Sequence, residues 1–232
     1  MGVDVVDEDR WARWAALAGV VFVVLVLLST FIPGSPPKLS DSSLKIFRYF
    51  HDHKSSLQIA SFLGGLAVIP ALIWASALWR RLRSAEDDGR GALLAITGLV
   101  VGGTLATASG VIVVTVAVRL AGLTPLGARF FFTLATFTGN ASAFGLAVLA
   151  LGTAMVTLRS GVFPRWFGWV SAALGLLWIV AGLGAAYTGD TPQTIALVVF
   201  LVFVVWILVS VALLWTPPKA AASSSAPAPT AS

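Results

Sequence analysis

Residues 194–215 read TIALVVFLVFVVWILVSVALLW, a stretch without any charged side chain or histidine. A helix that crosses the hydrocarbon core of a bilayer needs about 20 apolar residues. Each Leu, Ile, Val or Phe near the middle of such a helix favours insertion by roughly 0.3–0.6 kcal/mol. This stretch therefore predicts a membrane-spanning helix.

Five further stretches have the same character, and none of them contains Asp, Glu, Lys, Arg or His. They cover residues 14–32, 57–79, 92–118, 130–158 and 166–187. The first is longer than the apolar core of a signal peptide, about 7–15 residues, and no small-x-small cleavage site follows before Pro33. We therefore predict an all-α, polytopic membrane protein with a six-helix membrane domain over 14–215, a cytoplasmic N-terminus over 1–13 and a disordered cytoplasmic tail over 216–232.

Composition agrees with a membrane protein. Of the 232 residues, 58% are hydrophobic and 11% are charged, whereas soluble domains have about 45–50% apolar and about 25% charged residues. The chain has no cysteine, which excludes disulfides and thiolate-ligated metals. Its net charge of +5 comes from residues at the ends of apolar stretches. The expected partner of these charges is therefore the lipid headgroup region and not nucleic acid.

The positions of Lys and Arg predict the orientation, because cytoplasmic loops carry more of them. With both termini in the cytoplasm, nine lie inside and six outside. The inner ones are Arg10, Arg13, Arg80, Arg81, Arg83, Arg90, Arg159, Arg165 and Lys219, and the outer ones are Lys38, Lys45, Arg48, Lys54, Arg119 and Arg129. We therefore predict a multi-pass protein of the cell inner (plasma) membrane.

The first outer loop, residues 33–56, is the longest connection. Its prolines oppose helix formation at its start, after which Ser40 or Asp41 is placed to cap a short interfacial helix. Four apolar residues are expected on one side of this helix, namely Leu44, Phe47, Phe50 and Leu57. Residues 188–193 are predicted to form a tight turn on the same side of the membrane.

Small residues predict where the helices touch, because helices in lipid associate mainly through close packing. They recur at steps of three or four in the third, fourth and fifth spans. The predicted helix-packing residues are Gly98, Gly102, Gly139, Ala143, Ala147 and Gly175. The sixth span is bulky on all sides, which predicts a position at the lipid-facing edge of the bundle.

One polar face stands out inside the spans. Thr133, Thr136 and Asn140 share a side of the fourth span. A functional interpretation is a polar lining around a ligand. The structural interpretation, which we favour, is that the hydroxyls bond their own helix and that Asn140 bonds a neighbouring helix.

No residue pattern predicts catalysis. His51 and His53 flank Asp52 in the outer loop, but in a helix they point apart and no third zinc ligand is near. The spans lack the ionisable groups that ion-coupled transporters and intramembrane proteases need. We expect a protein that is not an enzyme, with no catalytic residue, no metal and no cofactor.

Two segments carry a resemblance. The fifth span begins with Pro164-Arg165-Trp166-Phe167-Gly168-Trp169, and the second span is preceded by residues 49–53, YFHDH, and ends at residues 78–83, LWRRLR. Over about residues 14–215 the chain resembles an uncharacterised family of small bacterial membrane proteins, a domain of unknown function. The resemblance implies six spans and a bacterial inner membrane. It implies no activity and no functional residues.

These observations lead to one expected function and one alternative. We expect a non-enzymatic membrane protein with a structural, accessory or regulatory role, whose partner is the lipid bilayer together with a second copy of the chain or another membrane protein. The alternative is binding or passive transport of a small apolar or amphipathic molecule between the second and fifth spans. The sequence does not identify such a ligand.

Overall fold

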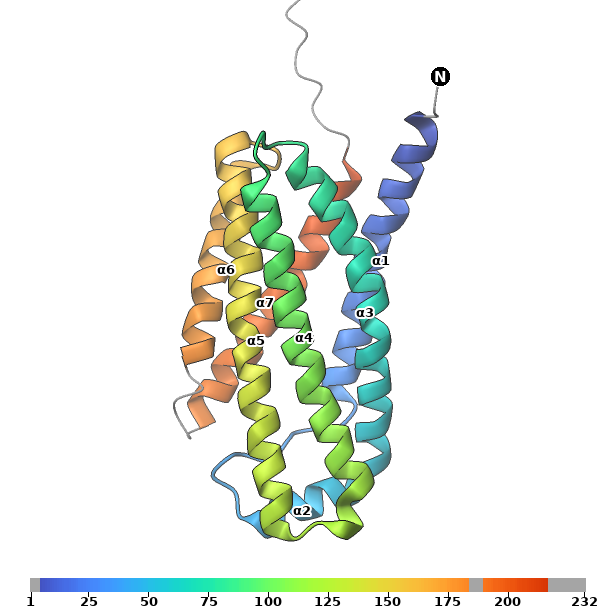
Figure 1. The fold of residues 1–232 in the computed structure, drawn as a ribbon, viewed down its shortest axis with the longest axis vertical. Helices are drawn as coiled ribbons and strands as arrows, with labels where there is room; N and C mark the ends of the chain where they lie inside the picture. Colours follow the sequence, from blue (N-terminus) through green and yellow to red (C-terminus); the bar gives the residue numbers. More distant parts are fainter. Residues whose placement is uncertain (1–4, 184–189, 217–232) are drawn as a thin grey trace, which may run out of the picture.

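The computed structural model describes residues 5–183 and 190–216, and these residues form helices joined by short connections. Figure 1 shows them as a bundle whose long helices run along one axis. The elements are α1 (Val5–Phe31), α2 (Ser43–Asp52), α3 (Lys54–Arg83), α4 (Arg90–Arg119), the 3-10 turn η1 (Leu120–Gly122), α5 (Pro125–Ser160), α6 (Arg165–Leu183) and α7 (Asp190–Trp215).

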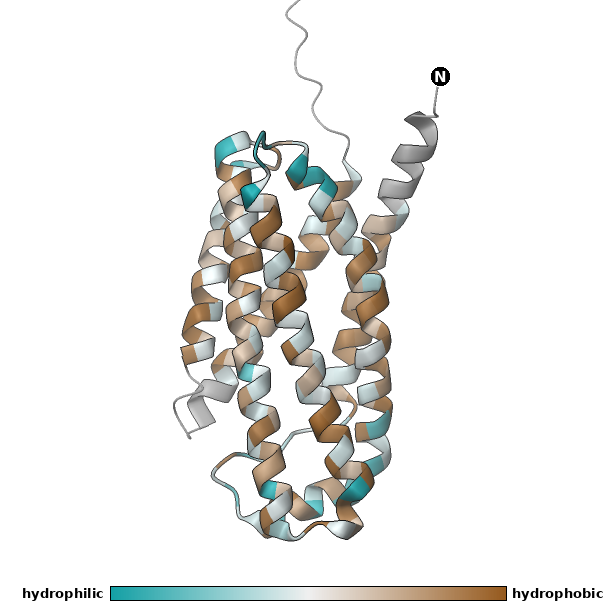
Figure 2. Cartoon of the chain, in the orientation of Figure 1, coloured by the Kyte–Doolittle hydropathy of each residue, from teal (hydrophilic) through white to brown (hydrophobic). Residues whose placement is uncertain are grey.

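Six of these helices are long and apolar enough to cross a membrane, namely all except α2. The chain is therefore a multi-pass membrane protein, and the predicted all-α, six-span fold is confirmed. Apolar residues cover the middle of the bundle and polar residues collect at its two ends (Figure 2). α3, α4 and α5 run past the predicted span limits at both ends, and the added turns at those ends carry Lys54, Arg83, Arg90, Arg119, Arg129 and Arg159.

The prediction for the turn before the last span was partly wrong. Residues 190–193 belong to the first turn of α7 and not to a connection. Residues 184–189, which include the end of the predicted fifth span, lie outside the described residues. The same holds for residues 217–232 of the predicted disordered tail.

The bundle is arranged as a ring of neighbours. α1 packs along α3, α3 contacts α4, α4 packs along α5, and α5 packs along α6. α7 closes the ring, since it contacts both α6 and α1 and crosses behind the other helices in Figure 1. The N-terminal part of α1 and the ends of α3, α5 and α7 lie together at one end of the bundle, and α2 lies at the other (Figure 1).

Aromatic side chains fill the centre of the bundle nearer to the first of these ends. Trp74 of α3 and Trp206 of α7 are fully buried and meet edge to face, with ring centroids 6.2 Å apart. Trp206 also stacks on Phe167 of α6 and on Phe203 of its own helix, at 5.5 and 5.8 Å. We call this group the tryptophan cluster, and the end of the bundle beyond it the tryptophan end.

The position of α7 corrects a prediction. Val199, Phe203, Val204 and Trp206 are buried in the same core as the other helices. α7 is therefore an integral member of the ring and not a helix at its edge. The prediction assumed that a helix with large side chains on every side could not pack closely. A helix of large side chains can bury one side against equally large neighbours.

A second, smaller core lies under α2, at what we call the cap end. Ile46 and Phe50 of α2 are buried with Val116 of α4 and Phe132 of α5. Phe50 and Phe132 meet edge to face at 6.1 Å. We call this group the cap cluster.

Two details of α2 differ from the prediction. Ser42, and not Ser40 or Asp41, caps the helix by accepting a hydrogen bond from the Lys45 backbone N–H. Leu44, expected on the apolar side, is exposed, while Ile46 takes its place in the core. The angle between residues along a helix is fixed, so the rotation of α2 against α4 and α5 decides which of its sides is buried.

α4 and α5 approach each other so closely that only glycine fits between them. A Cβ atom added to Gly98 would lie 2.5 Å from the backbone nitrogen of Leu149, and one added to Gly102 would lie 2.9 Å from the carbonyl oxygen of Ser142. From the opposite side, a Cβ on Gly152 would lie 2.7 Å from the Ala95 nitrogen. The two backbones are therefore in direct contact.

α5 uses two different faces for its two neighbours. Gly145 and Gly152, which the sequence analysis did not select, face α4. Ala147 faces α6, because a Cβ added to Gly175 would lie 3.2 Å from the Ala147 carbonyl oxygen. Gly139 faces Ser109 of α4, and Ala143 is buried. A single small-residue stripe was predicted where the helix has two.

Candidate functional site on the polar face of α5

The predicted polar face lies in the half of α5 nearer the cap end. Towards the cap end, α6 contacts α5 through Gly175 and then through Gly182. A Cβ atom added to Gly182 would lie 3.0 Å from the ring of Phe144 in α5. Asn140 follows one helical turn beyond Phe144, and Thr136 and Thr133 follow it in the same direction. All three side chains are half-buried. The face therefore begins where the described part of α6 stops covering α5.

The two threonine hydroxyls are engaged with their own helix. Thr133 donates to the carbonyl oxygen of Arg129 and Thr136 to that of Phe132, each at 2.9 Å. Both bonds follow the i to i−4 pattern that hydroxyls adopt in membrane helices. Each hydroxyl can still accept a hydrogen bond, but its only proton is already donated to a backbone carbonyl. These geometries favour the structural interpretation for both threonines.

Asn140 behaves differently. Its side-chain amide makes no hydrogen bond with any of the residues that the structure describes. The hydrogen bond to a neighbouring helix that the sequence analysis expected is therefore absent from the described part of the chain. An amide carries two N–H donors and one carbonyl acceptor, and an unpaired polar group in hydrocarbon costs free energy. Asn140 is thus the group on this face that is able to bind a neutral polar partner.

Hydrogen bonds between helices occur elsewhere. Ser109 of α4 donates to the Ala135 carbonyl oxygen of α5 at 2.8 Å. In the tryptophan cluster, the Trp206 indole N–H donates to Ser171 Oγ of α6 at 2.8 Å, and the Trp74 indole N–H donates to Ser210 Oγ of α7 at 3.1 Å. Both serines in turn donate to carbonyl oxygens of their own helices.

This serine–tryptophan network was not predicted from the sequence. Ser171 and Ser210 are isolated serines in apolar helices, and each becomes significant only when an indole from another helix reaches it. The only sequence signal is that a buried Trp needs an acceptor for its N–H. That rule does not say which serine supplies it.

The histidine segment lies on the surface of the cap end. His51 and His53 are exposed, and their ring nitrogens have separate partners. His51 Nδ1 lies 3.1 Å from an Asp52 oxygen, whereas His53 Nδ1 lies 3.1 Å from the Tyr49 carbonyl oxygen and its ring stacks on Tyr49. His53 also separates α2 from α3. Among the described residues, no group of three His, Cys, Asp or Glu side chains could hold a metal.

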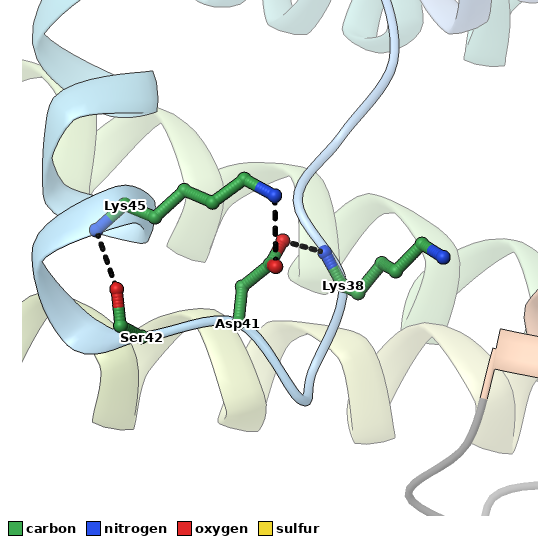
Figure 3. Close-up of polar contacts among 4 residues, drawn as sticks. All are labelled: Lys38, Asp41, Ser42 and Lys45. Carbon is green, nitrogen blue, oxygen red and sulfur yellow. Dashed lines mark hydrogen bonds and ion pairs between the residues drawn. The ribbon is translucent and has the colours of Figure 1, made fainter.

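A charged cluster fixes the loop before α2 (Figure 3). Asp41 accepts from the Lys38 backbone N–H and from Lys45 Nζ, each at 2.8 Å. These hydrogen bonds, first that from Lys45, hold the pKa of the Asp41 carboxyl below its ordinary value.

The same loop is held by Tyr49 of α2. Tyr49 donates its hydroxyl proton to the Pro33 carbonyl oxygen, and burial raises the pKa of that hydroxyl. These contacts explain how the loop before α2 is held.

At the tryptophan end, an open hollow of about 340 Å³ lies between the α3–α4 loop and the end of α5. Its lining includes Glu86, Asp88 and Arg159. Glu86 accepts from the Ala92 backbone N–H at 3.0 Å, and Asp88 accepts from Arg90 at 3.0 Å. Both carboxylates are therefore used at the start of α4.

Comparison of the chain with protein-family models, with curated proteins and with solved structures gives no match. The site must therefore be interpreted from its own geometry.

Proposed function

We propose that this protein is a non-enzymatic membrane protein with a structural or accessory role in a bacterial inner membrane. The observation that carries the proposal is the use made of polar groups in the core. Ser109, Ser171 and Ser210 join helices or receive indole N–H groups, and Thr133, Thr136 and Thr153 bond their own backbone. Polar side chains arranged in this way add cohesion to a bundle.

The second candidate is binding of a small amphipathic molecule, and Asn140 is the observation that favours it. Its amide is half-buried in a span and has no hydrogen bond with the described residues. A neutral ligand with a carbonyl or hydroxyl group would satisfy it. No ionisable residue lies on this face, so such binding would not be coupled to protons.

Replacement of Asn140 separates the two candidates. Under the structural proposal, Asn140→Leu leaves thermal stability in detergent unchanged or raises it, because it removes an amide without a hydrogen bond to the described residues, and it alters no binding. The matched control is Thr136→Val, which keeps the shape and removes a hydroxyl bonded only to its own helix.

The ligand side of the test uses a panel of medium-chain alcohols, amides and fatty-acid esters. A ligand that binds the folded state raises the midpoint of thermal unfolding. The structural proposal predicts no stabilisation by any of these probes. Stabilisation of the wild type and of Thr136→Val, lost in Asn140→Leu, would instead support binding at the α5 face.

Transport is tested in vesicles that contain the purified protein. The proposal predicts no uptake of the same probes driven by a pH gradient. Uptake that depends on both the protein and the gradient would contradict the accessory role.

We also propose that both termini lie in the cytoplasm, which rests on the distribution of Lys and Arg. The chain has no cysteine, so single replacements report their own position. Ser35→Cys and Ser84→Cys are both exposed positions at opposite ends of the bundle. An impermeant thiol reagent should label the first and not the second in intact cells, and the opposite result reverses the orientation.

A further inference from the structure

Arg81, at the tryptophan end, is a partly buried cation that lacks an anionic partner among the described residues. It lies in the last turn of α3 and is half-buried. Its Nε atom is shut off from solvent and has no hydrogen-bond partner. Within the described part of the chain, no hydrogen bond or ion pair is made by its guanidinium group.

The carboxylates of the neighbouring loop do not serve as its partner. Glu86 accepts from the Ala92 N–H, and Asp88 pairs with Arg90. Arg83, the last residue of α3, donates to the backbone carbonyl oxygen of Glu86. A partly buried guanidinium without an anion loses hydration without recovering it from the protein.

The guanidinium is nevertheless held in place. Its Cζ lies 5.9 Å from the ring centroid of Phe163, a buried residue in the connection between α5 and α6. A cation within about 6 Å of an aromatic face is attracted by the ring. The Phe163 contact therefore orients Arg81 and leaves its terminal Nη groups for a partner outside the described protein.

The position of Arg81 along the membrane normal identifies that partner. Trp79 precedes it by two residues, or about 3 Å of helix rise. Phe163 contacts Phe167 at 5.5 Å, and Phe167 contacts Trp166, an exposed indole, at 5.9 Å. Exposed Trp residues mark the interface between hydrocarbon and headgroups. Arg81 consequently lies where lipid phosphates are found.

We propose that Arg81, held by Phe163, binds the phosphate of an anionic phospholipid in the leaflet at the tryptophan end. Arginine presents parallel N–H groups that fit two phosphate oxygens at once. The exposed Arg165, the first residue of α6, adds positive charge at the same end of the bundle and favours a headgroup with net negative charge. The ligand class is a phospholipid such as phosphatidylglycerol, bound at one site and in addition to the general lipid annulus.

The experiment compares thermal unfolding of the purified full chain in neutral detergent with added dioleoylphosphatidylglycerol or dioleoylphosphatidylcholine. Phosphatidylglycerol should raise the midpoint by several degrees more than phosphatidylcholine does. Arg81→Gln should remove most of this difference. Arg159→Gln, an exposed arginine at the same end, is the matched control and should retain it.

Two further measurements keep the result unambiguous. Arg81→Lys preserves the charge without the planar group and should retain only part of the difference, which also covers the case that Arg81→Gln does not fold. Native mass spectrometry should show one tightly held phosphatidylglycerol on the wild type and on Arg159→Gln, and none on Arg81→Gln.

Three results would overturn the proposal. First, Arg81→Gln could retain the full difference in unfolding midpoint between phosphatidylglycerol and phosphatidylcholine. Second, Arg159→Gln could lose that difference equally. Either result would mean that the arginines at this end attract anionic lipid without a specific site. Inorganic phosphate added with phosphatidylcholine could reproduce the stabilisation, which would identify a soluble anion as the ligand in place of a lipid.

Discussion

At the tryptophan end, aromatic rings from α3, α6 and α7 meet in the centre of the bundle, whereas at the cap end the 10-residue helix α2 lies over α4 and α5. The tryptophan cluster is connected by indole N–H bonds to Ser171 and Ser210. The cap cluster belongs to a second core of eight buried residues, and the Asp41 and Tyr49 contacts hold the loop before α2.

α4 shows the same contrast within one helix. Gly91, Ala95, Gly98 and Gly102 are buried, and a Cβ added to any of these glycines would meet another residue within 3 Å. None of residues 103–115 is buried. A uniformly apolar helix can therefore be tightly packed in one half and only loosely packed in the other. Stability should therefore depend on the tryptophan end, and local motion on the cap end.

The largest effect is expected from Trp206→Ala, which empties the centre of the tryptophan cluster. Trp206 contacts three rings and donates to Ser171, so its loss should cost about 3–5 kcal/mol, as for other buried aromatic truncations. The measurement is thermal unfolding followed by circular dichroism in detergent.

Phe50→Ala in the cap cluster is the partner variant. Its cost should fall mainly on α2, which can separate from the bundle while the spans remain packed. Equal lowering of the global midpoint by both variants would mean that the two ends form one cooperative unit and would remove the contrast.

The next effect concerns Gly145→Ala, which tests the contact between the α4 and α5 backbones. The new methyl group would overlap backbone atoms of Gly102 and Gly98. Overpacking of this kind costs about 1–3 kcal/mol. The matched control is Gly103→Ala in the open half of α4, where a Cβ meets nothing within 4 Å. It should be neutral or stabilising, since Ala is a better helix former than Gly. A comparable loss in both variants would disprove the close approach.

A smaller effect is expected from neighbouring valines of α7. Val204 is 6% exposed and Val205 is 58% exposed. Val204→Leu should cost about 1 kcal/mol because it adds a methylene to a filled core, while Val205→Leu extends into lipid and should be silent. The pair tests whether α7 belongs to the ring, and equal unfolding midpoints would place it at the edge after all.

The smallest effect is local and depends on pH. The folded-state pKa of Asp41 is lowered by Lys45 first and by the Lys38 backbone N–H second. A lowered pKa means that the ionised carboxylate stabilises the folded loop above the ordinary value of 3.8, and that this stabilisation is lost as the pH falls through the folded-state pKa. Hydrogen exchange of residues 38–45 should therefore be slower in the wild type than in Asp41→Asn at pH 6.

That difference should shrink as the pH is lowered towards 3, with both proteins compared at each pH so that intrinsic exchange cancels. The global midpoint of unfolding should be the same for both. A difference that persists unchanged in acid would mean that the Asp41 carboxylate does not hold the loop.

Much of the candidate site could be named from the sequence but not interpreted. Thr133, Thr136 and Asn140 were placed on one face by helical periodicity alone. The backbone bonds of the threonines follow from a common local preference. The lack of a described partner for Asn140 depends on where α6 ends relative to α5, and no local pattern contains that information.

The sequence by itself determined the number of spans, the helical class and the short amphipathic helix between the first two spans. The hydrocarbon core imposes a length and a polarity on each spanning helix independently of its neighbours. Only the tertiary structure decided which face of each helix is used. Gly145 and not Ala147 meets α4, Trp206 brings α7 into the core, and Arg81 rests on Phe163. The physical reason is that lipid and protein interiors are equally apolar, so hydrophobicity does not distinguish a buried face from a lipid-facing one. The buried face is therefore decided by the shape of the facing surfaces and by single hydrogen bonds between helices. Both exist only once the helices are packed together.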